Sequence, residues 1–433
     1  MKTYKTCKFI KEALYLAPNE IRACCQRFFY KGKMRGDAKL IKKDNFNNLN
    51  SETLVQSRQK MLDEIQIDKN KDCLGCRYLT ETDERPKATN EIKLLSVEQH
   101  SFCNLRCTYC SEMFYGGKKP QYDVWGFASK LSQEGSFHNC RQVVWGGGEP
   151  TLDKSFENIF KTIQKNANPK IYHRVFTNSV RYSLPLEKFL REGKVKITTS
   201  MDAGTEETYK KVRGRGKMSN VLANLEKYSE IDSSKITIKY ILTDENNHPD
   251  ELHAFVNKMI NHNLKECYFQ ISVDYKKEKM DLNFVKSIVF LMDEFNKNGV
   301  KRYFVDDHVL ARILKLEEEN KLNILEYANK NDLNSIIYPN KDNKINLYGA
   351  GQICKDLINN TNILKNFKSF NIFDSDPSKL GKKINGIKVI SPEKLKNNTD
   401  KIFITSAHSY DEILKNIVRL QNSDTNVING LFL

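Results

Sequence analysis

The chain has 433 residues, of which 39% are hydrophobic and 10% aromatic; this suits about three folded domains and excludes a disordered chain. Its net charge of +16 is spread along the whole sequence, which favours a lysine-rich surface over a nucleic-acid site. No apolar run reaches the roughly 18 residues that span a bilayer, and the first residues do not resemble a signal peptide. We therefore expect a cytoplasmic protein without a membrane partner.

Residues 1–85 form a first segment that has little periodicity and is rich in cysteine. Disulfides are rare in a reducing cytosol, so clustered cysteines indicate metal or redox chemistry. A small segment with a weak core also often depends on a bound metal. Five of the 11 cysteines lie here: Cys7, Cys24, Cys25, Cys73 and Cys76. From the residues alone, an iron–sulfur cluster, a structural zinc ion and free thiols all stay open.

Residues 86–335 alternate strand-like and helix-like runs, which predicts βαβ units and a parallel sheet. The expected strands are Ile92–Glu98, Gln142–Trp145, Tyr172–Thr177, Lys196–Met201, Lys235–Leu242 and Glu266–Val273. The expected helices include Asp123–Gln133, Ser155–Lys165, Leu186–Glu192, Glu207–Val212 and Ser219–Ser229. Six such units predict a partial (β/α)6 TIM-like barrel rather than the complete eightfold one.

Residues 340–433 repeat this alternation on a smaller scale. The expected strands are Lys344–Tyr348, Phe370–Phe373 and Lys401–Thr405, and the expected helices are Ile353–Asn360 and Ser409–Leu420. This order predicts a small, doubly wound, Rossmann-like domain. The chain as a whole is thus expected to be α/β, with a small N-terminal module, a partial barrel and a Rossmann-like C-terminal domain.

Three cysteines lie within eight residues of the predicted barrel: Cys103, Cys107 and Cys110. Thiolates are the usual ligands of iron–sulfur clusters, and three of them on a [4Fe–4S] cluster leave the fourth iron open to another molecule. The alternative is a structural zinc ion, which needs four ligands, and His100 is the nearby candidate for the fourth.

The sequence Cys103-x3-Cys107-x2-Cys110, with Tyr109 before the last cysteine, resembles the signature of the radical S-adenosylmethionine (radical SAM) superfamily. In that family the cysteine loop follows the first strand of a partial barrel, as it follows Ile92–Glu98 here. The resemblance implies a [4Fe–4S] cluster that cleaves S-adenosylmethionine reductively, with an external electron donor. The products are methionine and a 5′-deoxyadenosyl radical, which abstracts hydrogen from a substrate.

Further features at the ends of the predicted strands match the same family. Gly146-Gly147-Gly148-Glu149-Pro150 follows the second strand, and the resemblance implies that it holds the amino group of S-adenosylmethionine. Glycines allow a close approach of the backbone, and a carboxylate suits an ammonium group. The resemblance assigns further cofactor contacts at strand ends and after a helix, at Asn178, Ser200, Asp202 and Arg213.

The N-terminal cysteines resemble part of a SPASM or twitch module, which binds an auxiliary cluster in some radical SAM enzymes. The matched features are Cys7, a predicted hairpin that ends in Cys24-Cys25, a helix at Ser57–Ile65, and Cys73-x2-Cys76. The resemblance implies a second [4Fe–4S] cluster on Cys7, Cys24, Cys73 and Cys76, with Cys25 as the alternative to Cys24.

The C-terminal segment carries Gly349-Ala-Gly351, and Asp374 lies 25 residues after the first glycine. Glycines before a helix bind phosphate, and a later acid binds ribose, although Cys354 replaces the third glycine of the dinucleotide pattern. The segment resembles Rossmann-like domains of enzymes that build sugars and surface polysaccharides. That resemblance implies a nucleotide or nucleotide-sugar, against the alternative of a scaffold that binds nothing.

Taken together, the sequence predicts a radical SAM enzyme that acts on a small anionic substrate, with a sugar or nucleotide-sugar as the favoured class. Two alternatives stay open: an enzyme that modifies peptides, and a non-catalytic iron–sulfur or zinc protein. The glycine-rich loop argues against the second alternative, because a structural metal site needs no pocket for methionine.

Overall fold

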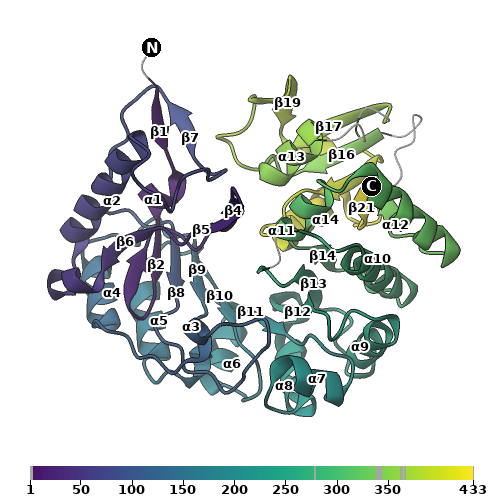
Figure 1. Cartoon of the computed structure of the whole chain (residues 1–433), viewed down its shortest axis with the longest axis horizontal. Helices are drawn as coiled ribbons and strands as arrows, with labels where there is room; N and C mark the ends of the chain where they lie inside the picture. The colour runs from purple at the N-terminus through teal and green to yellow at the C-terminus, as the bar shows by residue number, and fades with distance from the viewer. Residues whose placement is uncertain (1–2, 277–278, 338–343, 361–363, 365–366, 433) are drawn as a thin grey trace. The chain divides into compact units, whose positions relative to one another are not determined.

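The computed structural model describes residues 3–276, 279–337, 344–360, 364 and 367–432. The chain divides into two compact units (Figure 1). Unit 1 comprises residues 1–199 and 213–236, and unit 2 comprises residues 200–212 and 237–433. The division falls inside the predicted barrel segment, and each unit is a mixed α/β structure with a parallel sheet at its centre.

The sheet of unit 1 has the strand order β11-β10-β9-β8-β2-β3-β6. The first five of these strands are parallel, and β3 and β6 are antiparallel additions at one side. Their bounds are β11 Val195–Ser200, β10 Tyr172–Phe176, β9 Gln142–Trp145, β8 Leu94–Val97, β2 Ala13–Leu16, β3 Glu20–Arg22 and β6 Lys39–Lys42. The first four predicted strands are β8 to β11. The N-terminal segment is not separate from this sheet, because β2 pairs with β8.

Helices cover one face of this sheet through apolar side chains. In α5 (Phe156–Lys165) the buried residues recur every three or four positions, which is the helical period. The ring of Phe160 on α5 stacks 3.9 Å from Phe189 on α6 (Leu184–Arg191), and 3.9 Å from His173 on β10. Residues that alternate with His173, such as Arg174, therefore point to the opposite face of the sheet.

The remaining elements of unit 1 surround its cysteines and flank its strands. They are β1 Tyr4–Thr6, α1 Lys8–Glu12, β4 Arg27–Tyr30, β5 Lys33–Gly36, η1 Lys43–Asn48, α2 Ser51–Gln66, β7 Thr80–Thr82, α3 Glu112–Tyr115, α4 Val124–Gln133, η2 Pro150–Leu152, α8 Met218–Asp232 and η3 Ser233–Lys235. Asn50 caps α2, since its side-chain oxygen accepts a hydrogen bond from the Thr53 amide at 2.9 Å.

Unit 2 begins with parallel strands in the order β14-β13-β12. These strands are β12 Ile236–Leu242, β13 Tyr268–Val273 and β14 Tyr303–Val305, and the helices around them are α7 Glu206–Arg213, α9 Pro249–Asn261, α10 Leu282–Lys297, α11 Asp307–Ile313 and α12 Glu318–Lys330. The last two predicted strands are β12 and β13. The sequence did not predict β14, whose three residues are too few to show a period.

The C-terminal part of unit 2 is a second sheet with the order β18-β19-β17-β16-β20, in which all strands but β18 are parallel. Its elements are β16 Lys344–Tyr348, α13 Gln352–Asn360, β17 Ser369–Phe373, β18 Lys383–Ile384, β19 Ile387–Ile390, η5 Pro392–Leu395, β20 Lys401–Ile404 and α14 Tyr410–Gln421. A short pair joins β15 (Ile336–Ile337) to β21 (Leu431–Phe432). Residues 340–343, 361–363, 365–366 and 433 of the predicted domain lie outside the described part.

Aromatic rings join α14, beside this second sheet, to the strands at the start of unit 2. The ring of Tyr410 lies 4.9 Å from Phe304 and 6.5 Å from Tyr268. Across the described residues, no helix is long and apolar enough to cross a membrane.

Candidate active site

The loop that follows β8 holds Cys103, Cys107 and Cys110, all half-buried. The Cys110 amide donates to the Cys107 carbonyl at 3.1 Å, which forms a tight turn between the last two cysteines. The Leu105 amide lies 3.4 Å from the Cys103 sulfur and donates to it. The cysteine loop is therefore folded into turns that bring the three thiols near one another.

The three thiols influence one another electrostatically. Desolvation raises the pKa of Cys103, and the negative charges of Glu149 and Cys107 add to the rise. Desolvation and then Cys107 raise the pKa of Cys110 to about 11. Thiolates that are desolvated and repel one another are stabilised by cations, so this donor set suits the irons of a cluster.

The glycine-rich loop after β9 lies directly against the backbone of the cysteine loop. The amides of Gly148 and Glu149 donate to the carbonyls of His100 and Phe102, at 3.0 and 2.6 Å. A Cβ atom on Gly148 would lie 2.1 Å from the Phe102 oxygen, and Gly147 has a φ of +87°. Only glycine permits this close approach of the two backbones. This explains why a glycine-rich loop accompanies the cysteine loop in this chain.

The Glu149 carboxylate is buried and already hydrogen-bonded within the chain. One oxygen accepts from the Thr151 amide (3.2 Å), the Thr151 hydroxyl (2.6 Å) and the Thr177 hydroxyl (2.8 Å), and the other accepts from the Asn178 amide (2.6 Å). Each carboxylate oxygen has about two lone-pair positions, so Oε1 is fully used whereas Oε2 keeps one position for a further donor. Burial raises the pKa of Glu149, and the hydrogen bonds oppose that rise. In the structure, Glu149 thus ties the glycine-rich loop to the end of β10.

Asn178 connects the end of β10 to the cysteine loop. Its side-chain nitrogen donates to the Asn104 side-chain oxygen at 2.6 Å and lies 3.8 Å from the Cys103 sulfur. Its side-chain oxygen accepts from the Val180 amide at 3.0 Å. Sequence reasoning missed Asn104, because nothing in the spacing of the motif distinguishes it from a loop residue.

Arg213 and Tyr109 are also brought together. The Arg213 guanidinium donates to the Tyr109 hydroxyl, and the Arg106 amide donates to the Arg213 carbonyl at 3.0 Å. Gly214 has a φ of +74°, and a Cβ there would lie 2.5 Å from the Arg106 oxygen. The Arg213-Gly214 turn therefore packs against the cysteine loop, and Arg106 is a further contact that the sequence did not indicate.

Two other predicted site residues, Ser200 and Asp202, belong to unit 2. Asp202 is buried with a φ of +58°, and its side chain accepts from the Ile241 amide at 2.7 Å. Its carbonyl accepts from the Asn246 side chain at 2.9 Å. Within unit 2, Asp202 thus fastens the segment that begins at Ser200 to β12.

A cavity in unit 1 is lined by Cys7, Cys24, Cys73 and Cys76, together with apolar side chains that include Phe9 and Phe28. Desolvation raises the pKa of each of these thiols, and further rises come from other thiols of the group. Gly75 shapes the Cys73–Cys76 turn with a φ of +79°, and a Cβ there would lie 2.1 Å from the Tyr30 ring. The structure thus gathers the four cysteines that the sequence proposed as a set.

Cys25 is not among the residues that line this cavity. Desolvation and then the Glu98 carboxylate raise its pKa, so its thiol is close to the end of β8. In the described residues, no group of three or more His, Cys, Asp and Glu side chains is arranged to hold a single metal ion.

The glycine loop of the second sheet lies between β16 and α13. Gly349 has a φ of +113°, and a Cβ on Gly351 would meet nothing within 4 Å. The Asp374 carboxylate at the end of β17 accepts from the Ala350 amide (2.8 Å) and from Lys379 (2.7 Å). The acid that the sequence assigned to a ribose therefore braces the glycine loop in this structure.

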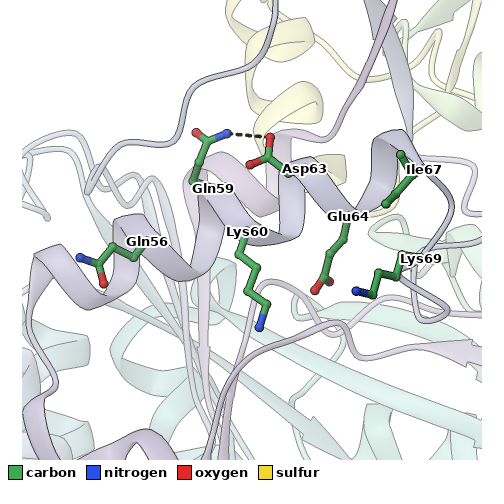
Figure 2. A pocket seen from close by; sticks show the side chains of 7 residues that line it. All are labelled: Gln56, Gln59, Lys60, Asp63, Glu64, Ile67 and Lys69. Carbon is green, nitrogen blue, oxygen red and sulfur yellow. Dashed lines mark hydrogen bonds between the residues drawn. The ribbon is translucent and has the colours of Figure 1, made fainter.

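A further hollow follows the exposed side of α2 and is open to solvent (Figure 2). Its lining residues are Gln56, Gln59, Lys60, Asp63, Glu64, Ile67 and Lys69. None of the predicted site residues lies there, and no nucleophile or metal-ligand set accompanies it, so it is not a candidate for chemistry.

Comparison with known proteins identifies the domain that holds the cysteine loop. A family model described as the radical SAM superfamily matches residues 97–256, from the end of β8 into α9. Residues 97–256 are a radical SAM domain. This confirms, for this part of the chain, the family predicted from the cysteine motif, and it indicates an enzyme. The family implies a [4Fe–4S] cluster and S-adenosylmethionine. A second model, described as C2185-like, N-terminal, matches residues 341–428.

Curated proteins similar to this chain include GTP 3′,8-cyclases. The chain is 24% identical to the one from Haemophilus influenzae over 199 residues, which is 46% of this chain and 58% of that protein. It is 25% identical to the one from Clostridium botulinum over 174 residues, which is 40% of this chain and 54% of that protein. The chain thus spans little more than half the length of these relatives.

Solved structures similar to the radical SAM enzyme include SuiB from Streptococcus suis bound to the precursor peptide SuiA. The match has 13% identity and a TM-score of 0.41, and it covers 58% of this chain and 62% of SuiB. A second is anSMEcpe with bound AdoMet and the Cp18Cys peptide, with 23% identity, a TM-score of 0.40, and coverage of 52% of this chain and 65% of that one.

The contact between the two loops of the radical SAM domain gives a first prediction. We expect Gly148→Ala to lower the free energy of unfolding by about 1–3 kcal/mol, because the new Cβ must displace the backbone at Phe102. We also expect less iron to bind on anaerobic reconstitution. Denaturant unfolding and iron analysis measure the two effects. Gly351→Ala is the matched control, since its Cβ meets open space; equal behaviour of the two variants would contradict the prediction.

Proposed function

We propose that this chain cleaves S-adenosylmethionine reductively and uses the product radical to abstract hydrogen from a small anionic substrate. The observation that carries the proposal is the packing of the glycine-rich loop and the Arg213 turn onto the cysteine loop. A structural metal site needs only its ligands, whereas these contacts build a surface around them. The cluster and S-adenosylmethionine would supply the one-electron chemistry when bound.

The chain's own residues would have distinct tasks in this proposal. Cys103, Cys107 and Cys110 would hold three irons. The Glu149 carboxylate holds the glycine-rich loop to the end of β10 through Thr177 and Asn178. We propose that the remaining lone pair of its Oε2, together with the backbone of the loop, meets the amino group of the cofactor. Asn178 would hold the Cys103 sulfur and Asn104 in place.

Two further assignments are part of the proposal. Cys7, Cys24, Cys73 and Cys76 would hold an auxiliary [4Fe–4S] cluster that relays electrons or stabilises the N-terminal segment; their shared cavity supports this. The loop Gly349–Gly351 would bind a nucleotide or nucleotide-sugar, which the open space beside Gly351 supports. Asp374 would then act by bracing that loop.

The test is to incubate the anaerobically reconstituted protein with S-adenosylmethionine and a strong reductant, without any substrate. We expect methionine and 5′-deoxyadenosine to form in equal amounts. Omitting the reductant should stop both products. A protein that carries iron and sulfide but forms neither product would overturn the proposal in favour of a non-catalytic iron–sulfur protein.

A further inference from the structure

A two-stranded hairpin, formed by β4 and β5, brings positive charge to the surface of unit 1 (Figure 1). Residues 27–36, which make up the hairpin, include four cations and no acid. The turn Lys31-Gly32 at its tip has φ values of +50° and +72°, as a type I′ turn requires. Lys31 and Lys33 are both exposed. The sequence therefore builds a hairpin whose tip is cationic.

The hairpin is fastened to the residues that lead into the last two auxiliary cysteines. The Arg35 guanidinium donates to the Lys71 carbonyl at 2.8 Å. The Gly36 amide donates to the Asp72 carbonyl at 3.1 Å. Since Cys73 follows directly in the sequence, these two hydrogen bonds hold the cationic hairpin against the cysteine turn.

The same hairpin covers the turn between Cys73 and Cys76. The Tyr30 ring packs on Gly75, where a Cβ atom would lie 2.1 Å from it. Gly75 is nevertheless exposed, and Cys76 is half-buried. The cavity of the four auxiliary cysteines, which Phe28 of β4 also lines, therefore lies beneath this part of the surface.

Cations surround Tyr30 at this surface. Nζ of Lys31 lies 5.5 Å from the centroid of the Tyr30 ring, and the guanidinium carbon of Arg35 lies 5.8 Å from it. Lys33, the register partner of Tyr30, and Lys71 are both exposed. We call the following residues the cationic patch: Lys31, Lys33, Arg35 and Lys71. Gathered charges of one sign attract a partner of the opposite sign.

The acids next to the cationic patch do not neutralise it. Asp37, which follows β5, is paired with Arg22 at 3.2 Å and with Arg27 at 2.8 Å. Asp72 is half-buried, whereas the cations at the tip are exposed. Among the residues that the structure describes, no acid forms an ion pair with a member of the patch. The patch thus presents its charge to solvent.

We infer that the cationic patch is the docking site of an acidic protein that carries single electrons. Exposed cations attract and orient an acidic partner, and the cavity of the auxiliary cysteines lies beneath the same part of the surface. Interfaces between electron-transfer proteins are small and weak, so a patch of this size suffices. A nucleic acid, the other kind of polyanion, has no use for the thiols below the patch.

The redox part of this inference rests on the function proposed above, whereas the docking does not. Reductive cleavage of S-adenosylmethionine consumes one electron, and that electron has to come from outside the chain. The docked carrier loses one electron, and the auxiliary cluster on Cys7, Cys24, Cys73 and Cys76 gains it. No covalent bond forms or breaks in this step.

Calorimetric titration of the reconstituted full chain with an oxidised plant-type [2Fe–2S] ferredoxin, an acidic one-electron carrier, tests the docking. The test variant reverses three exposed cations of the patch: Lys31→Glu, Lys33→Glu and Lys71→Glu. The control variant makes the same change in net charge at exposed cations of α4, α5 and α6: Lys130→Glu, Lys165→Glu and Lys188→Glu. Thermal unfolding checks that both variants are folded.

We expect the Kd for ferredoxin to rise at least tenfold in the test variant and to stay within a few-fold of the wild type in the control variant. In the wild type the Kd should also rise with ionic strength, because salt screens exposed charges. Cleavage of S-adenosylmethionine gives a second measurement. With dithionite, a small reductant that needs no docking, all three proteins should react equally; with reduced ferredoxin, the test variant should react at least tenfold more slowly.

Three outcomes would overturn the inference. The wild type could fail to bind ferredoxin, the test and control variants could bind it alike, or a labelled RNA could bind the patch more tightly than ferredoxin does, which would assign the patch to nucleic acid. A wild type that cleaves nothing even with dithionite would contradict the function proposed above, and the calorimetric result would still decide the docking.

Discussion

Replacing Cys103, Cys107 and Cys110 together by alanine will halve the bound iron and end the cleavage of S-adenosylmethionine. The wild type should bind about eight irons and the variant about four, since each [4Fe–4S] cluster holds four and the second group of cysteines is untouched. Activity should fall to background, because no other described feature holds the cofactor beside a redox centre. Iron and sulfide analysis after anaerobic reconstitution, together with product chromatography, measures both effects.

Cys140→Ala provides the control for this variant. Cys140 is buried, and its thiol contacts the Gln142 carbonyl, away from both cysteine groups. It should keep all the iron and activity. Alternatively, the wild type could bind about four irons and the triple variant none. That result would support the radical SAM site and would rule out the auxiliary cluster. A triple variant that retains all its iron would refute the assignment of the three ligands.

The parts of the fold that the sequence predicts are those fixed by local pattern. The strands β8 to β13 and the helices between them follow from alternating apolar runs, and they match the structure within a few residues. The pairing of β2 with β8 could not be predicted in this way, because it joins Leu14 to Leu95 across 81 positions. The strand β14 was missed because three residues carry no period.

The candidate site shows the same division between local and distant information. The spacing of the cysteines and the run of glycines could be recognised in the sequence, and the structure places these loops in contact. The hydrogen-bond partners of Glu149 could not be recognised in the sequence, because Thr177 and Asn178 come from the end of the next strand. A carboxylate that looks free in a motif is thus held by neighbouring strands once they are paired.

The N-terminal cysteines allow a test in which two neighbouring residues give opposite results. We expect Cys24→Ala to lose about four irons per chain, because Cys24 lines the cavity with Cys7, Cys73 and Cys76. We expect Cys25→Ala to keep all of them, because Cys25 does not line this cavity.

In these two variants, the stability of the N-terminal segment should change together with the amount of bound iron. The core beneath the cavity is small and includes the cysteines themselves, together with Ile10, Met61 and Leu62. Four desolvated thiols become ligands only when a metal compensates their charge, so metal binding and folding of this segment are coupled. Cys24→Ala should therefore make the N-terminal segment more sensitive to limited proteolysis, whereas Cys25→Ala should not. If Cys25→Ala lost iron and Cys24→Ala did not, Cys25 would be the ligand in place of Cys24. One tightly bound zinc ion in the wild type, in place of these four irons, would replace the auxiliary cluster by a structural zinc site on the same four sulfurs.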